Sequence, residues 1–335
     1  MLRIAVLGCG RIGRMHAANV AAHPRATLAS VYDVHRPSAD EVAARYGVHV
    51  AETAEAVFAS PDVDAILVAT ATPTHADYIE QAVQAGKPVL CEKPIDLSLA
   101  RVEACADAIR GKNPVIQLGF NRRFDPGHRA ARDAVRAGEI GDLHQVVITS
   151  RDPGMPPRAY YEAAGGLFRD MTIHDFDLAR FLLEEEPEDV FAIGGRLIDA
   201  PLMNELNDFD TAMFVLRTAS GKQCHINNSR TSAYGYDQRV ELLGTTGMVI
   251  SGNRKPHEIT HFSASHTERA VPYLEFFAER YSEAFNAEIG AFVEAVEKGV
   301  APEVGFEDGR KALILAEAAL KSAAEGRIVK VSEVE

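Results

Sequence analysis

Residues 2–13, LRIAVLGCGRIG, decide the fold of the first part of this chain. An apolar run over residues 3–7 reads as a buried strand, and Gly8, Gly10 and Gly13 follow it directly in the spacing GxGxxG. Glycines at these positions allow a tight turn and the close approach of a pyrophosphate, whose charge the first amides of the next helix would face. The stretch therefore predicts a strand, a phosphate-binding turn and a helix, the opening of a dinucleotide-binding domain.

The end of the second predicted strand bears on which dinucleotide is bound. Asp33 stands there, 20 residues after Gly13, where an acidic side chain can hydrogen-bond the adenosine ribose and repel a 2′-phosphate. We therefore expect NAD rather than NADP. Arg36 could stack on adenine or accept a phosphate, which leaves dual use open, and Asp33 could instead be a turn residue. FAD and S-adenosylmethionine proteins can share the glycine pattern.

The hydrophobic pattern divides the chain into two parts. Short apolar runs at 3–7, 27–32, 65–69, 89–91 and 115–120 alternate with helical stretches, which predicts a doubly wound parallel sheet. After a helix ending near Gly138, longer β-rich segments follow one another at 143–151, 190–197, 211–218, 222–231, 238–243 and 247–250. These predict an α+β domain with a large antiparallel or mixed sheet. We expect a Rossmann domain over 1–122 and a substrate-binding and oligomerisation domain over 123–335.

Bulk composition excludes several classes of partner. The net charge is −13 and no basic run is present, which disfavours nucleic acid and anionic membranes. No apolar stretch reaches the roughly 18 residues that span a bilayer. Four cysteines are scattered without CxxC spacing, and the chain opens at once into a strand-like run without a signal peptide, so we expect a cytoplasmic protein with a small-molecule partner.

Residues 165–175, GGLFRDMTIHD, predict proton-transfer chemistry. Asp170 and His174 are four apart at the start of a predicted helix, so the carboxylate could orient the imidazole. Histidine takes and returns a proton near neutral pH because its ordinary pKa is about 6.5. Asp170 could instead be an N-cap and His174 a core histidine. A metal site of His174 with Asp175 and Asp177 is a weaker alternative, because neighbouring helical residues point in different directions and no HExxH or cysteine cluster supports it.

Lys93, in the Glu92-Lys93-Pro94 sequence, is a candidate electrophile. It follows a parallel strand at the sheet edge where ligands collect. A lysine there could hydrogen-bond a substrate hydroxyl and offset its negative charge as it becomes alkoxide-like. The alternative is a solvated surface lysine.

Five motifs together carry a family resemblance. They are GxGxxG at 8–13, ATPTH at 71–75, EKP at 92–94, NRRFDP at 121–126 and DMTIHDFD at 170–177. With them the chain resembles, over essentially its whole length, the glucose-fructose oxidoreductase and inositol dehydrogenase (Gfo/Idh/MocA) family. SRDP at 150–153 and GGLFRD at 165–170 look most like its inositol 2-dehydrogenases.

The resemblance implies a catalytic trio and a cofactor site. The trio is Lys93, Asp170 and His174, with Lys93 and Pro94 joined by a cis peptide bond. The implied cofactor contacts are Gly8, Gly10, Arg11, Ile12, Gly13, Asp33, Arg36, Thr70, Thr72, Pro73, His75, Glu92 and Lys93. A departure from the family pattern is Phe285, which stands where related enzymes frequently carry a tyrosine.

The implied reaction is NAD-dependent oxidation of a ring secondary alcohol, with myo-inositol as the first expectation. His174 would remove the hydroxyl proton, and no metal is expected. An uncharged polyol needs many directional hydrogen bonds. The substrate candidates are Arg123, Arg151, Asp152, Asn228, Tyr234 and Tyr236. Arg151 and Asp152 could instead be a surface ion pair, and either tyrosine a core residue.

Three further expectations concern function and assembly. The first alternative is a dehydrogenase of another inositol isomer or a pyranose sugar, because the same trio can serve any cyclic secondary alcohol. A protein that only senses dinucleotide is the second alternative, although such a protein would be expected to lose part of the trio. The resemblance also implies a homotetramer, with a homodimer as the alternative, because the open sheet face of this family commonly forms the assembly.

Overall fold

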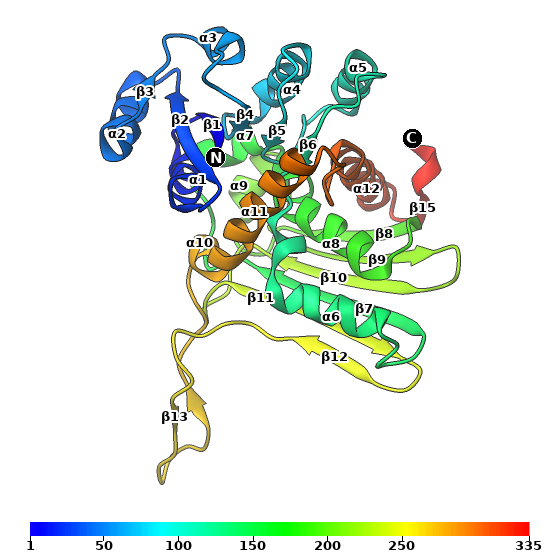
Figure 1. The fold of residues 1–335 in the computed structure, drawn as a ribbon. Coiled ribbons are helices and arrows are strands. Elements are labelled where there is room, and N and C mark those ends of the chain that lie inside the picture. The colour runs from blue at the N-terminus through cyan, green and yellow to red at the C-terminus, as the bar shows by residue number, and fades with distance from the viewer. Residues whose placement is uncertain (335) are drawn as a thin grey trace. The chain divides into compact units, whose positions relative to one another are not determined.

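Two compact units make up the structure, a computed structural model that describes residues 1–334 (Figure 1). The first unit comprises Met1–Phe124 and Glu283–Leu313, and the second comprises Asp125–Ser282 and residues 314–334. The first boundary between the units, after Phe124, lies two residues beyond the boundary expected at 122. The expected second domain is not continuous, however, because the chain returns to the first unit at Glu283.

The first unit is built on a six-stranded parallel sheet of order β3-β2-β1-β4-β5-β6. Its strands are β1 (Leu2–Leu7), β2 (Ala26–Tyr32), β3 (His49–Val50), β4 (Ala65–Val68), β5 (Val89–Cys91) and β6 (Ile116–Leu118). The helical segments are α1 (Arg11–Ala22), α2 (Arg36–Tyr46), α3 (Ala54–Ala59), η1 (Thr72–Thr74), α4 (His75–Gln84), α5 (Leu99–Ile109) and η2 (Asn121–Phe124). The strand order reverses beside β1, which is where doubly wound sheets bind ligands at the carboxyl ends of their strands.

Helix α11 (Ser282–Lys298) comes from the far end of the sequence and completes the core of the first unit. Ile289, Phe292 and Val293 on its apolar face join the cluster that contains Ile4 and Leu90 from the sheet. A short helix, α10 (Phe277–Arg280), precedes α11 and is separated from it by Tyr281. Burial of this apolar stripe explains why the chain returns to the first unit.

The second unit is built on a seven-stranded mixed sheet of order β12-β11-β7-β10-β9-β8-β15. Only the β7 and β10 pair is parallel. The strands are β7 (Leu143–Arg151), β8 (Pro187–Gly195), β9 (Thr211–Thr218), β10 (Gln223–Ser229), β11 (Asp237–Gly244), β12 (Met248–Ser251) and β15 (Val329–Lys330). This is the mixed sheet that the β-rich segments predicted.

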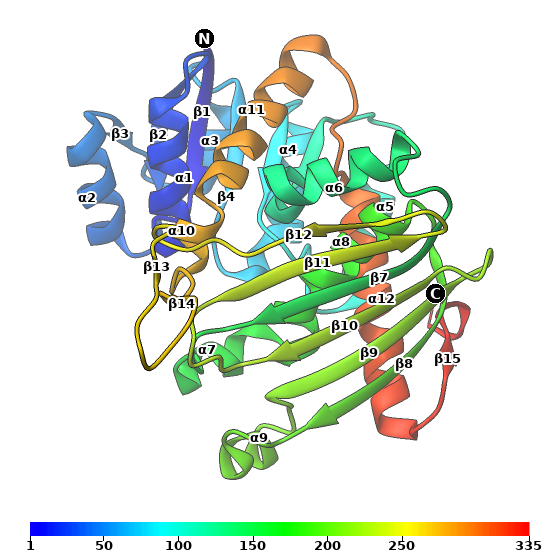
Figure 2. The same ribbon diagram turned by 90° about the horizontal axis from the view of Figure 1, so that it is seen from below.

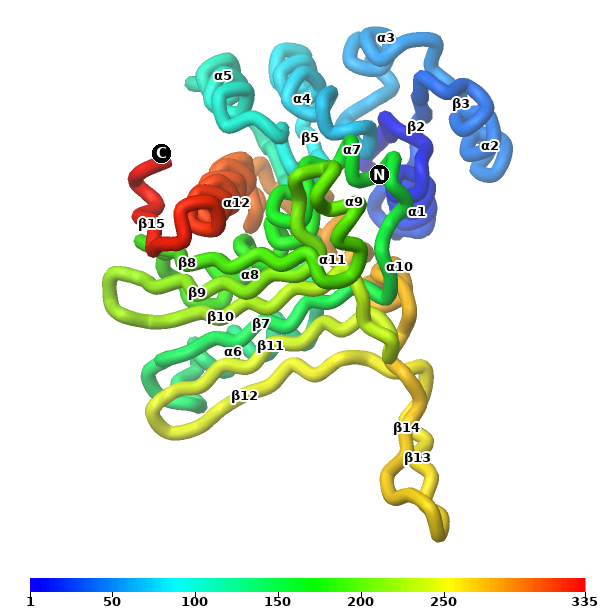
Figure 3. Tube along the Cα trace, turned by 180° about the vertical axis from the view of Figure 1, so that it is seen from behind, coloured from blue at the N-terminus to red at the C-terminus, as the bar shows by residue number. Residues whose placement is uncertain are grey.

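Helices cover one face of this sheet (Figure 2). The helical segments of the unit are α6 (Pro126–Arg136), α7 (Arg158–Ala164), η3 (Phe168–Thr172), α8 (Ile173–Leu183), α9 (Ala200–Glu205), α10, the second half of α12 (Phe306–Glu325) and η4 (Val331–Glu333). Helix α6 packs on β11 and β12, and α8 packs on β7 and β10. A separate hairpin of β13 (Thr260–His261) and β14 (Arg269–Ala270) extends away from the sheet (Figure 3).

Candidate functional site

The three glycines of the first turn have three different surroundings. Gly8 has a φ of +93°, and a Cβ added there would lie 2.3 Å from the Ala69 carbonyl oxygen. A Cβ on Gly13 would lie 1.9 Å from the Gly8 carbonyl oxygen, so α1 can approach the strand only without a side chain there. A Cβ added at Gly10, in contrast, would meet no heavy atom of the described residues within 4 Å, apart from its chain neighbours and the backbone of its own helix. The turn is therefore closed by Gly8 and Gly13 and open at Gly10, as close approach of a pyrophosphate requires.

The N-terminus of α1 is suited to the same group. Gly10 is its N-cap and supplies no side-chain cap, and the first turn carries no acidic residue. The first amides of the helix are therefore available to an anion. These residues fit the phosphates of a dinucleotide.

Asp33 is fixed at the carboxyl end of β2 by backbone amides. Its Oδ2 accepts a hydrogen bond from the Cys9 amide at 2.6 Å, and its Oδ1 accepts one from the His35 amide at 2.7 Å. The side chain thus stands beside the glycine turn, the place expected for a ribose-binding carboxylate. Arg36 is exposed and paired with Asp40 and Glu52, with its Nε 2.8 Å from Asp40 Oδ1. A 2′-phosphate would have to compete with these two carboxylates for Arg36.

The Glu92-Lys93-Pro94 segment is joined to the loop after β4 by His75. The Lys93–Pro94 peptide bond is cis, which confirms the expectation. His75 is buried, its Nδ1 lies 2.7 Å from the Pro94 carbonyl oxygen, and its Nε2 lies 3.1 Å from the Thr70 carbonyl oxygen. Burial lowers the pKa of His75, although both carbonyl oxygens act in the opposite direction. His75 therefore holds together two loops that were each expected to contact the cofactor.

Asp170 and His174 lie on one continuous helical stretch, but the first part of it is not α-helical. Residues Phe168–Thr172 form a π-helical turn and α8 begins at Ile173, so Asp170 is on the π turn and His174 on the α-helix. Asp208 accepts hydrogen bonds from the Leu167 amide at the entry to this turn, and a Cβ on Gly166 would lie 2.8 Å from Asp208 Oδ1. Single π turns occur frequently at functional sites. The N-cap alternative for Asp170 does not apply, because Asp170 is inside the helical stretch.

Arg230 clamps Asp170 in place. Its Nη2 donates to Asp170 Oδ2 at 2.9 Å, and its Nη1 donates to Asp152 Oδ2 at 3.0 Å. Tyr160 donates its hydroxyl proton to Asp170 Oδ1 at 2.8 Å, and the Arg230 guanidinium lies over the ring of Tyr161. Burial opposes the charge of Arg230, but Asp170 and Asp152 outweigh it and raise its pKa. Burial and then Asp170 raise the pKa of Tyr160, which keeps this hydroxyl a donor.

A second buried network connects α8 to the carboxyl end of β10. Asn228 accepts from the Thr172 hydroxyl at 2.6 Å and donates to Asp175 Oδ2 at 2.9 Å. Asp175 is fully buried, and Asp177 lies 3.6 Å from Arg180. Asp175 and Asp177 thus have protein partners, and no group of three or more His, Cys, Asp or Glu side chains is placed to hold a metal ion within residues 1–334.

The remaining substrate candidates fall into different surroundings. Arg151, at the end of β7, contacts Asn227 Oδ1 at 2.8 Å and the Tyr234 hydroxyl at 2.6 Å, and Tyr234 donates to Asp237 at 2.9 Å. Tyr236 is buried, with its ring edge-on to Tyr281. In the first unit, Arg123 is buried on η2 and donates to Asp308 Oδ1 at 2.8 Å.

Comparison with known proteins places this geometry in a family. Residues 2–120 match the family described as "Oxidoreductase family, NAD-binding Rossmann fold", and residues 128–250 match the "GFO/IDH/MocA C-terminal domain". The chain is 45% identical over 331 residues to the inositol 2-dehydrogenase of Rhizobium meliloti (strain 1021), covering 99% of each protein. The chain belongs to the Gfo/Idh/MocA family.

Solved structures of Gfo/Idh/MocA members agree with the fold. The chain matches a myo-inositol dehydrogenase from Corynebacterium glutamicum ATCC 13032 with a TM-score of 0.96 and 43% identity over 98% of each chain. It matches scyllo-inositol dehydrogenase from Lactobacillus casei, solved with bound NAD(H) and scyllo-inositol, with a TM-score of 0.90 and 30% identity over 99% of each chain. These matches confirm the expected family, the two-part fold and the NAD-binding Rossmann domain.

Four residues beside the expected site residues, two in each unit, carried no recognisable sequence signal. Arg230 and Tyr160 hold Asp170, His16 contacts Glu92 across 2.6 Å, and Glu288 is a fully buried carboxyl on α11. Phe285, the family departure, packs edge-on against His16, with ring centroids 5.8 Å apart. A buried charge partner for Asp170 could have been expected from its burial, but which arginine supplies it depends on the strand pairing.

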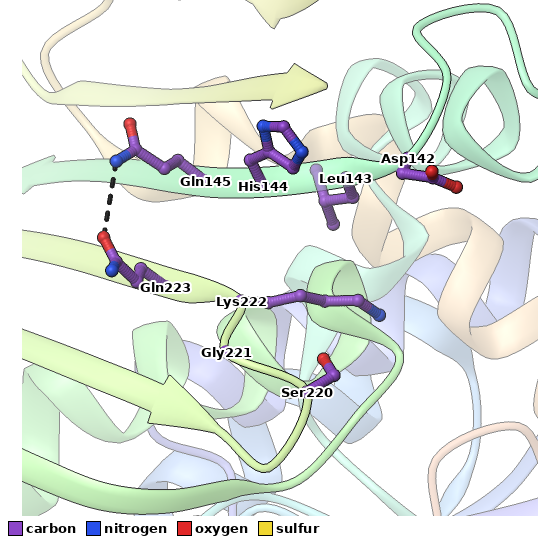
Figure 4. Close-up of a pocket in the computed structure, with 8 residues that line it drawn as sticks. All are labelled: Asp142, Leu143, His144, Gln145, Ser220, Gly221, Lys222 and Gln223. Atoms are coloured by element: carbon purple, nitrogen blue, oxygen red, sulfur yellow. Dashed lines mark hydrogen bonds between the residues drawn. The ribbon is translucent and has the colours of Figure 1, made fainter. Parts of the chain in front are cut away.

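The second unit has a surface hollow (Figure 4). It is lined by residues 142–145 at the start of β7 and residues 220–223 at the start of β10. Arg151, Asp152 and Asn228 stand at the opposite ends of the same two strands, about 20 Å away at 3.3 Å per residue. The hollow is therefore not part of the candidate site.

Proposed function

We propose that this protein oxidises a ring secondary alcohol of a cyclic polyol with NAD, with myo-inositol as the substrate and the 2-keto-inositol as the product. The observation that supports this most strongly is that Asp170, held by Arg230, lies on a π turn in the same helical stretch as His174. The chain is also 45% identical to an inositol 2-dehydrogenase. NAD, when bound, accepts the hydride that leaves the carbinol carbon.

The protein's own groups move the proton. We assign His174 as the general base that removes the hydroxyl proton of the substrate. Asp170 orients its imidazole and favours the charged form that results. Lys93 hydrogen-bonds the same substrate oxygen and offsets its growing negative charge. Because Arg230 and Tyr160 both donate to Asp170, they restrict the directions in which this carboxylate can point.

The cofactor is assigned to the edge of the first sheet. The pyrophosphate would lie against Gly10 and the first turn of α1, where Gly8, Gly13, Arg11 and Ile12 complete the turn. Asp33 would bind the adenosine ribose, with Arg36 beside it. Thr70, Thr72, Pro73, Glu92 and Lys93 would line the nicotinamide ribose, and His75 would hold their two loops together.

An uncharged polyol would be bound by the mixed donors and acceptors at one edge of the second sheet. Arg151 and Asp237 are paired in register on β7 and β11, and Tyr234 bridges their side chains. Asp152 adds an acceptor beside them. Arg123 and Tyr236 are retained as weaker substrate candidates, since both are buried in protein contacts.

The test is NADH formation by the purified protein with myo-inositol, scyllo-inositol, D-chiro-inositol, glucose, galactose and xylose, repeated with NADP. Turnover of myo-inositol with NAD is the expected result. Turnover of scyllo-inositol alone would favour the second candidate, which the relative solved with bound scyllo-inositol supports. Turnover of a sugar alone would contradict the inositol assignment, and tight NADH binding without any turnover would indicate a dinucleotide sensor.

We also propose that the protein assembles as a homotetramer through the open face of the second sheet. Apolar side chains on that face are exposed in register, since Ile193 pairs with Met213 and Leu243 pairs with Met248. Val215 and Ile250 extend the same face. An apolar area of this kind commonly marks a protein interface. Light scattering should give four subunits. Val215→Glu should reduce that number, whereas Val300→Glu, at an exposed position of the first unit, should not. A dimer would restrict the assembly to this one interface.

A cytoplasmic location is proposed from the cysteines. Cys9, Cys91, Cys105 and Cys224 are all buried free thiols, as a reducing compartment maintains them. Burial raises the pKa of Cys9 to about 12, which keeps its thiol unreactive. In the part of the chain that the structure describes, no helix is long and apolar enough to cross a membrane. Fractionation of the native host would test this location.

A further inference from the structure

Helix α11 places an unusual carboxyl inside the first unit. Glu288 is fully buried, and neither of its carboxyl oxygens has a hydrogen-bond partner among the described residues. Its backbone carbonyl accepts from Gln117 Nε2 at 2.9 Å, while Gln117 Oε1 is also buried and has no partner within residues 1–334. Buried polar atoms are nearly always satisfied, so each exception requires an explanation.

A second carboxyl, Glu92, belongs to the same buried cluster. Its Oε1 lies 2.6 Å from His16 Nε2, and a Cβ on Gly119 would lie 2.9 Å from its Oε2. The position of Glu92 is thus confined on two sides. Two elements bring groups to Glu288: Gln117 of β6 donates to its backbone carbonyl, and the Glu92 carboxyl after β5, which itself contacts His16 of α1, acts on it electrostatically.

The charges of this cluster cannot all be present together at low cost. The Nε2 atom of His16 contacts Glu92, and neither oxygen of Glu288 has a donor among the described residues. A second anion in the same buried volume would have no partner. Burial, and then the charge of Glu92, raise the pKa of Glu288 well above its ordinary value of 4.5. Glu288 is therefore the carboxyl that retains its proton.

We propose that Glu288 is a proton-carrying residue of the nicotinamide site, neutral beside Glu92, and that it releases its proton to solvent more readily with NAD⁺ bound than with NADH bound. This inference rests on the proposed place of Glu92 at the nicotinamide ribose. The nicotinamide ring is cationic in NAD⁺ and neutral in NADH, so only NAD⁺ offsets a second carboxylate. By linkage, the preference for NAD⁺ over NADH then rises with pH.

The experiment measures the dissociation constants of NAD⁺ and NADH across the pH range in which the protein is folded. For the natural protein, the ratio of the NADH dissociation constant to the NAD⁺ dissociation constant should rise by roughly tenfold from acid to alkaline pH. This is the effect expected of the attraction between two unit charges about 10 Å apart in a partly polar interior. Glu288→Gln has the shape of the neutral acid and cannot lose the proton, so most of the rise should be lost, and only the contribution of other groups such as His174 should remain. Glu294→Gln, on the exposed face of the same helix, should behave like the natural protein.

Two results would overturn the inference: a ratio in the natural protein that does not depend on pH, or the same dependence in Glu288→Gln. If Glu288→Gln does not fold, a second measurement decides the question. Calorimetry in two buffers gives the number of protons that the natural protein releases on binding NAD⁺. A release of zero at every pH overturns the inference. Glu92→Gln separates this inference from the proposed site. If Glu92→Gln leaves both dissociation constants unchanged, the place of Glu92 at the cofactor is wrong. If Glu92→Gln alters the ratio of the two constants but Glu288→Gln does not alter its pH dependence, only the role of Glu288 is refuted.

Discussion

Replacement of Arg230 by glutamine tests whether the clamp on Asp170 has the energetic weight that its burial suggests. The Arg230 side chain is 4% exposed, and its carboxylate partners Asp170 and Asp152 are 9% and 20% exposed. Removing one partner from a buried ion pair costs roughly 3–5 kcal/mol, because the remaining charge is uncompensated. Arg230→Gln leaves two such charges, so we expect at least this loss of unfolding free energy.

The loss should be visible as a lower melting temperature. A change of 1 kcal/mol shifts the melting temperature of a domain of 150–250 residues by about 2–4 °C, which predicts a drop of roughly 6–20 °C for Arg230→Gln. Scanning calorimetry measures it directly. Arg158→Gln is a matched control, since Arg158 is an exposed arginine of the same unit that pairs with Glu205 and should be replaceable with little effect.

Two further variants and one activity measurement complete this test. Arg230→Lys retains the charge without the planar fork that spans both carboxylates, and should fall between the natural protein and Arg230→Gln. Adding Asp152→Asn to Arg230→Gln should restore part of the loss. NADH affinity should be unchanged, because the proposed cofactor residues are in the first unit, while kcat/KM should fall. A melting temperature as high as that of Arg158→Gln would refute the reasoning.

Four other substitutions test separate parts of the argument. His174→Ala should lower kcat/KM by about 10²–10⁴ while NADH still binds, and an unchanged rate would exclude it as the base. Gly10→Ala should fold but bind NADH more weakly, whereas Gly8→Ala should lower the melting temperature because its Cβ meets the Ala69 carbonyl; equal melting temperatures would contradict this. Burial alone would raise the pKa of Asp125, but His128 and Arg280 lower it overall. The ionised Asp125 carboxylate therefore stabilises the fold at pH values above its ordinary pKa of 3.8, and this stabilisation is lost as the pH falls through its lower pKa in the folded protein. Asp125→Asn should reduce the unfolding free energy at pH 7. Urea titrations should show that the difference between the variant and the natural protein shrinks in acid.

Much of the fold could be predicted because its signals are local. The β1 run and the glycine turn lie within twelve residues, and β7 and β9 were predicted with the bounds that the structure has. Strand β3 was not predicted, because its two residues are too short to show a periodic pattern. The return of α11 to the first unit could not be predicted either, because an apolar helical stripe does not specify which sheet it will cover.

The candidate site divides in the same way. Asp170 and His174 are close in sequence and could be recognised together, but the π turn that carries Asp170 depends on Asp208, 38 residues further on, which accepts from the Leu167 amide. Arg230 reaches Asp152 because the end of β10 lies beside the end of β7. The position of Glu288 depends on the docking of α11. Such residues are specified by packing across long sequence separations, which one sequence read alone does not display.

The discontinuity of the first unit has a consequence for biosynthesis. When Phe124 has emerged from the ribosome, the sheet is complete but its apolar surface for Ile289 and Phe292 has no cover until residues 125–282 and then α11 have been made. At about 5–20 residues per second, translation of that stretch takes roughly 8–30 seconds. The nascent dinucleotide-binding unit thus passes through an interval in which chaperones could bind it. A fragment ending at residue 124 would keep that exposed surface permanently, whereas one that joins residue 124 to residue 283 through a flexible linker would restore the missing helix.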